Sequence, residues 1–150
     1  MPKQIVISEL GGPEVLKYQN YDLPSNIKNN EVRIKHTAIG LNYIDTYHRS
    51  GIYPLPSTLP VCPGLEAAGE VIDIGVNVKA FKIGDRVAYA SPPMGAYCDI
   101  RDFPENKLIN IPNFLKNDDV ASILLQGMTV EYLFERLYKI QKNDFILFHA

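Results

Sequence analysis

The feature that most constrains the fold is a series of short segments, between residues 4 and 111, in which apolar and polar residues tend to alternate. Alternation with a period of two is typical of half-buried strands. Glycine, proline or asparagine turns separate the segments, which lie at residues 4–8, 15–21, 31–39, 67–75, 86–90, 95–101 and 107–111. Short strands at this spacing predict an all-β barrel or sandwich.

Two places in this series depart from simple alternation. In residues 31–39 the apolar parity slips near His36. A slip by one residue turns side chains to the opposite face, so we expect a β-bulge there or a strand buried on both sides. Residues 52–63 hold four prolines. Proline breaks helices and central strands, so this stretch is predicted to be an ordered loop.

Between these two places lies a short helix. Asn42 or Asp45 is expected to cap its N-terminus, and Gly51 to end it. Asp45 and Arg49 are four residues apart, a spacing that favours an ion pair on the helix surface.

The last part of the chain changes period. Asn117 followed by two aspartates predicts a helix N-cap, and apolar residues then recur at helical spacing. Gly127 and Thr129 are expected to interrupt this helix, with Thr129 as the cap of a second one. Residues 144–150 begin with an aspartate and then run almost continuously apolar, as does a strand buried on both faces of a parallel sheet.

Composition excludes several classes of partner. The net charge is −2 and the isoelectric point is about 5.9, so nothing indicates binding to nucleic acid or anionic lipid. No segment resembles a signal peptide or a membrane span, which predicts a soluble, cytoplasmic protein. Cys62 and Cys98 are expected to be free thiols in a reducing compartment.

An ordered set of motifs carries a family resemblance. Residues 59–87, LPVCPGLEAAGEVIDIGVNVKAFKIGDRV, resemble the signature region of the medium-chain dehydrogenase/reductase superfamily. The stretch AIGLNYIDTYHRSGIYP, residues 38–54, resembles its zeta-crystallin-like quinone oxidoreductase branch. The motifs GGPEVL, GAYCD, LLQGMTVEYL and ILFHA follow in the order of that branch. The resemblance covers essentially the whole chain.

The resemblance implies a fold and two domains. It implies a mainly β fold: a GroES-like barrel with short flanking helices, followed by the first helix and strand of a Rossmann domain. Residues 1–126 would be the substrate-side domain and residues 127–150 the start of the cofactor domain. The family's glycine-rich phosphate-binding turn follows the strand that we expect at residues 144–150, so the chain is expected to be truncated before the main NADPH site.

The resemblance also implies site residues. Asn42, Tyr47, Gln126 and Thr129 would contact the cofactor, and Tyr47 and Tyr53 would face the substrate. The cysteine and histidine that bind zinc in related alcohol dehydrogenases are absent from the matching positions, so no metal is expected. From the residues alone, both tyrosines are also compatible with packing roles, Asn42 with a cap alone, and Thr129 with a helix cap.

The implied activity is NADPH-dependent reduction of a quinone, with this chain alone inactive. One alternative is an enal or enone reductase of the same superfamily; another is a GroES-like binding or assembly module without catalysis. The exposed edges of an apolar strand need a cover. We therefore expect either a homodimer or a separate Rossmann polypeptide as partner.

Overall fold

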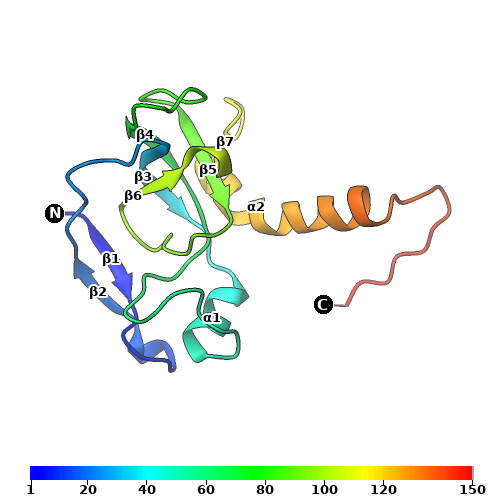
Figure 1. Cartoon of the computed structure of the whole chain (residues 1–150). Coiled ribbons are helices and arrows are strands. Elements are labelled where there is room, and N and C mark those ends of the chain that lie inside the picture. Colours follow the sequence, from blue (N-terminus) through cyan, green and yellow to red (C-terminus); the bar gives the residue numbers. More distant parts are fainter. Residues whose placement is uncertain (150) are drawn as a thin grey trace.

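A computed structural model describes residues 1–149, and antiparallel strands form its body (Figure 1). One sheet has the order β6-β3-β4-β5-β7, and a separate hairpin pairs β1 with β2. The mainly β class expected from the sequence is therefore confirmed. The strands are β1 (Lys3–Val6), β2 (Lys17–Asn20), β3 (Glu31–Ile39), β4 (Glu66–Ile74), β5 (Arg86–Ala90), β6 (Ile100–Pro104) and β7 (Ile109–Asn110).

The long strand β3 lies between β4 and β6 and organises the sheet. Its register with β4 shifts between His36 and Ala38, as the slip in alternation predicts, and again between Arg33 and Ile34. The shifts keep apolar side chains on the core face although the alternation is imperfect. That core contains Ile34, Val71, Val87, Tyr89 and Phe103, all nearly inaccessible to solvent.

Helix α1 (Tyr43–Ser50) has the predicted boundaries. Asn42 is its N-cap, and Gly51 ends it in the left-handed conformation with φ 81°, which glycine adopts without steric cost. The proline-containing stretch that follows, residues 52–63, is a loop, as predicted. One isolated bridge, between Val61 and Ile7, fastens its far end to the chain just after β1.

Helix α2 (Asn117–Glu131) differs from the prediction at both ends. Its N-cap is Lys116, because the Asn117 side chain accepts hydrogen bonds from Arg86 and donates one to Thr37 at 2.6 Å. The expected interruption is wrong: α2 runs through Gly127, and the Thr129 hydroxyl donates to the Leu125 carbonyl at 3.1 Å instead of capping a second helix. A π-helical segment, Tyr132–Leu137, continues from it.

Two predicted strands are also corrected. Residues 95–99 lie outside the five-stranded sheet, and β6 begins only at Ile100. The described part of the apolar run, residues 144–149, is unpaired and lies apart from the sheet (Figure 1), with Phe145, Leu147 and Phe148 exposed. A strand buried on both faces needs neighbours on both edges, and residues 1–149 provide none there. Ala150 lies outside the described residues.

Within residues 1–149, neither helix combines the length and the apolar character that crossing a membrane requires.

Candidate active site

A buried carboxylate joins three elements of the fold. Glu66, the first residue of β4, is 1% exposed. Its Oε1 accepts the backbone N–H of Leu125 in α2 at 2.8 Å, and its Oε2 accepts the side-chain amide of Asn42 at 2.7 Å. Because carboxylate hydrogen bonds are strong and directional, Glu66 fixes the N-terminus of α1 against α2.

The Asn42 side chain continues this network. Its Nδ2 donates to Glu66, and its Oδ1 accepts from Gln126 Nε2 at 3.1 Å. Two of the residues implied as cofactor contacts, Asn42 and Gln126, are therefore neighbours although 84 positions separate them. Asn42 therefore does more than cap a helix, because it begins α1 and its side chain also bonds to β4 and α2.

Asp45 closes the first turn of α1 instead. Its Oδ2 accepts the Asn42 backbone N–H at 3.0 Å and the Tyr97 hydroxyl at 2.8 Å. The surface ion pair expected between Asp45 and Arg49 is not formed among the described residues. Asp45 is buried, and the Arg49 guanidinium donates to the Gly11 carbonyl instead, at 3.2 Å.

Burial raises the pKa of both Asp45 and Tyr97, which are hydrogen-bonded to each other. Desolvation raises the pKa of Asp45, although its hydrogen bonds to the Asn42 backbone and the Tyr97 hydroxyl act in the opposite direction. Burial, followed by the nearby Asp45 carboxylate, raises the pKa of Tyr97, which therefore stays a hydrogen-bond donor. Asp45 Oδ1 and His48 Nδ1 are buried without a partner within residues 1–149.

Two tyrosines, Tyr47 in α1 and Tyr53 in the loop after it, form an aromatic pair. The rings of Tyr47 and Tyr53 lie 5.3 Å apart, tilted by 59°, and the Tyr53 backbone N–H donates to the Tyr47 carbonyl at 3.2 Å. His48 packs edge-on to Tyr53 at 6.2 Å. Tyr47 is half-buried, whereas Tyr53 is 47% exposed, so part of this aromatic pair is open to solvent.

Comparison with known proteins identifies the family of the domain. The alcohol dehydrogenase GroES-like domain family matches residues 28–134. This chain belongs to that family.

The relatives of this GroES-like domain are longer. A quinone oxidoreductase of Pseudomonas aeruginosa is 46% identical over 150 residues, which are the whole of this chain and 46% of that protein. A 2-haloacrylate reductase of a Burkholderia species is 41% identical, over 97% of this chain and 44% of its own length. The chain thus spans under half the length of these relatives. The similarity to the Pseudomonas aeruginosa protein confirms the expected resemblance to quinone oxidoreductases.

A solved structure supports the same assignment. The crystal structure of Escherichia coli quinone oxidoreductase complexed with NADPH matches with a TM-score of 0.90 and 39% identity. The match covers 95% of this chain and 43% of that one. The GroES-like fold that the sequence motifs imply is therefore confirmed.

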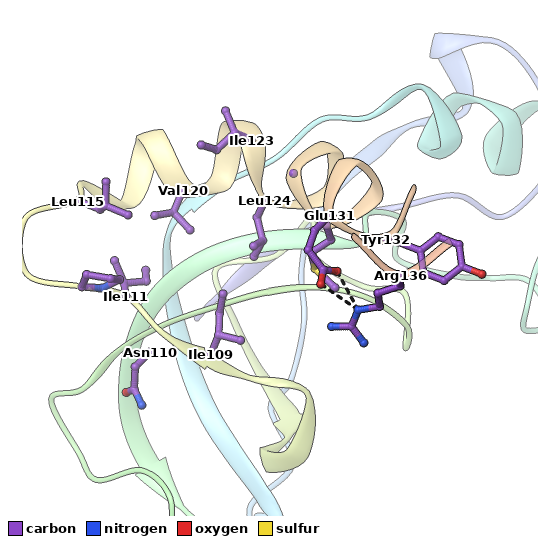
Figure 2. A pocket seen from close by; sticks show the side chains of 13 residues that line it. Ile109, Asn110, Ile111, Leu115, Val120, Ile123, Leu124, Glu131, Tyr132 and Arg136 are labelled. Atoms are coloured by element: carbon purple, nitrogen blue, oxygen red, sulfur yellow. Dashed lines mark hydrogen bonds and ion pairs between the residues drawn. The ribbon is translucent and has the colours of Figure 1, made fainter. Parts of the chain in front are cut away.

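An apolar groove lies on another face of the GroES-like domain. It has a volume of about 590 Å³ and lies between β7, α2 and the π-helical segment. Figure 2 shows Ile109, Ile123 and Leu124 on this surface, with an ion pair between Glu131 and Arg136 beside it. None of the expected site residues lines this groove, so it is distinct from the polar network around Glu66.

Sequence reasoning missed two features of the domain. It did not connect Glu66 with Asn42 and Gln126. It also gave no sign that His36 Nε2 lies 3.0 Å from the Tyr89 hydroxyl. Within residues 1–149, no three His, Cys, Asp or Glu side chains gather where they could hold a metal ion.

Proposed function

We propose that this chain is the substrate-side part of a zinc-independent NADPH:quinone oxidoreductase. The observation that carries the proposal is the Glu66 network. It places Asn42, at the start of the helix that bears Tyr47, in hydrogen-bond contact with Gln126 on α2. The similarity to quinone oxidoreductases over the whole chain supports the same reading.

The residues present fit the nicotinamide end of NADPH, which would supply a hydride when bound. The Thr129 hydroxyl donates to the Leu125 carbonyl but keeps its oxygen lone pairs for a ligand donor. Gln126 is exposed and bonds to Asn42 through Nε2 alone. Asn42 retains one amide hydrogen and one carbonyl lone pair beyond its two bonds. Together these groups could orient a carboxamide.

The tyrosines would act on the substrate side. Within residues 1–149, no hydrogen-bond partner occupies the hydroxyl of Tyr47 or Tyr53, so both remain available to a carbonyl oxygen. A quinone is planar and already electrophilic, so ring stacking and hydroxyl donors suffice to bind and orient it. We assign Tyr47 to the boundary between cofactor and substrate, and Tyr53 to the substrate alone.

Residues 127–150 would begin the cofactor domain, with residues 1–126 forming the substrate-side domain. Apolar side chains are exposed along this stretch, including Met128, Leu137 and Phe148. Exposed apolar surface of this kind is typical of a face that another part of a protein covers.

A chimera tests the proposal directly. Residues 1–150 would replace the matching 150 residues of the Pseudomonas aeruginosa relative, and NADPH oxidation would be followed with benzoquinones. We expect quinone-dependent oxidation. A folded chimera that oxidises no NADPH with any quinone would refute the proposal, and circular dichroism with size-exclusion chromatography establishes folding.

Reduction of an activated alkene is the second candidate activity. The 41% identity to a 2-haloacrylate reductase favours it, because that protein's name specifies an activated alkene substrate. The same chimera separates the two activities. Turnover of 2-chloroacrylate or a simple enone with none of any quinone would favour the alkene reductase.

A further inference from the structure

The structure brings the two cysteines of the chain together along one strand. Val61 exchanges two backbone hydrogen bonds with the residue after β1, at 2.9 and 3.0 Å, and the Tyr97 carbonyl accepts one from β1 at 2.8 Å. The residues that make these bonds, Ile5 in β1 and Ile7 just after it, are two positions apart. Their backbone groups therefore point to the same edge of the β1 strand. Cys62 and Cys98 directly follow the two bonded residues and therefore lie side by side.

The thiol contacts agree with this placement. Cys62 Sγ lies 3.4 Å from the Tyr97 carbonyl oxygen, which belongs to the peptide unit leading into Cys98. Each thiol shifts the pKa of the other, and Cys98 Sγ lies 3.9 Å from His36 Nδ1. Both cysteines are free.

The surroundings favour the thiolate of Cys98. The Gly95 carbonyl at 3.2 Å from its sulfur favours the protonated thiol, and burial does so too. Stronger opposing effects come first from the hydrogen bond of the Cys62 thiol, then from His36 and the positive charge of Arg101, and they lower the pKa of Cys98 to about 5. The pKa of Cys62 is raised, because that thiol keeps its proton to donate.

A small molecule can reach the pair. Cys98 is only 5% exposed, but it lines two cavities of about 350 and 400 Å³. Cys62 is half-buried, at the end of the proline-containing loop. A hydroperoxide is far smaller than either cavity.

We propose that Cys62 and Cys98 form a peroxide-oxidisable dithiol, a modification site separate from the quinone and NADPH site. The Cys98 thiolate attacks one peroxide oxygen, the O–O bond breaks, and a sulfenic acid forms while the other oxygen leaves as hydroxide. Cys62 sulfur then attacks Cys98 sulfur and displaces the second hydroxide. Two protons, one from each original thiol, convert the hydroxides to water, so two thiols are oxidised and one hydrogen peroxide is reduced to two waters.

The resulting disulfide would fasten the loop of residues 52–63 to the segment before β6. That loop carries Tyr53, and the segment carries Tyr97, whose hydroxyl bonds to Asp45. Oxidation would therefore restrain the loop that carries Tyr53 relative to the segment that carries Tyr97.

Peptide mapping tests the proposal on the 150-residue chain. We expect one equivalent of hydrogen peroxide to remove two hydrogen atoms from the intact mass and to yield a monomeric product with Cys62 and Cys98 in one cross-linked peptide. In Cys62→Ser, the reaction should stop at a Cys98 sulfenic acid that dimedone traps. In Cys98→Ser, Cys62 should remain reduced. Circular dichroism confirms that each variant is folded.

The pH dependence of alkylation provides an independent readout, because its midpoint does not depend on how easily the reagent reaches the sulfur. We expect the alkylation rate of Cys98 to reach half its maximum near pH 5, against about 8.5 for an ordinary thiol. His36→Gln should raise this midpoint. A cross-link found only between chains, first labelling at Cys62, or an ordinary midpoint for Cys98 would each overturn the proposal.

Discussion

Replacing Glu66 with alanine should destabilise the fold far more than the same change at a neighbouring exposed glutamate. Glu66→Ala removes the acceptor of two buried donors, the Leu125 N–H and the Asn42 amide. Hydrogen bonds to charged groups contribute about 1.5–3 kcal/mol each, so the gross loss is about 3–6 kcal/mol. No cation within residues 1–149 pairs with Glu66, so relief of its desolvation offsets part of this loss.

The net effect should be a loss of about 2–4 kcal/mol of unfolding free energy, or roughly 5–15 °C in melting temperature for a chain of this size. Urea unfolding followed by tyrosine fluorescence measures it, since the chain has nine tyrosines and no tryptophan. Glu70→Ala is the matched control, because Glu70 is exposed on the same strand, and it should change stability by less than about 0.5 kcal/mol. If Glu66→Ala is as stable as the parent chain, desolvation outweighs the hydrogen bonds and the reasoning fails.

Three further predictions concern the same region. Gly40→Ala should destabilise the fold by more than about 3 kcal/mol, because a Cβ there would overlap the Ala121 carbonyl oxygen and the Glu66 carboxylate. Urea unfolding measures this loss. A soluble variant as stable as the parent chain would contradict the prediction. The raised pKa of Asp45 means that the folded state holds its proton more tightly, so this group's contribution to stability falls as pH rises from the ordinary aspartate range through the raised value. Asp45→Asn should flatten that part of the pH–stability curve, and a slope identical to the parent's would contradict the assignment. In the chimera, Tyr47→Phe should lower kcat/KM for a quinone roughly tenfold, the value of one hydrogen bond. Tyr43→Phe is the control, because Tyr43 is exposed on the same helix, and it should change kcat/KM little. Equal effects of the two substitutions would refute the role proposed for Tyr47.

Local rules predicted much of the fold. The bounds of β3 and β5, the register slip near His36, and the ends of α1 at Asn42 and Gly51 depend on alternation, capping and turn chemistry, which neighbouring residues determine. Gly127 misled the prediction of α2. A single glycine in a helix costs only about 1 kcal/mol, so packing of Val120 and Ala121 elsewhere on the helix outweighs it.

Long-range contacts account for what the sequence could not predict. Nothing near Asn42 indicates that its amide bonds to residues 24 and 84 positions away. Residues 95–99 have strand-like composition, but their backbone pairs mostly with β1 and with residues 63–64, and only the Asp99 carbonyl accepts a hydrogen bond from β3. The apolar run from Phe145 has the composition of a buried strand, yet burial needs neighbouring strands that no local pattern supplies.

The Glu66 carboxylate also gives the polar network a direction. An ionised carboxylate only accepts hydrogen bonds, so Asn42 must present its NH₂ group inward and its carbonyl outward. That carbonyl in turn accepts from the NH₂ group of Gln126, so the Gln126 carbonyl takes no part in this bond. The buried Glu66 side chain thus determines which end of the Gln126 amide is held inside the network, and under the proposed function the other end would suit a ligand that brings a donor.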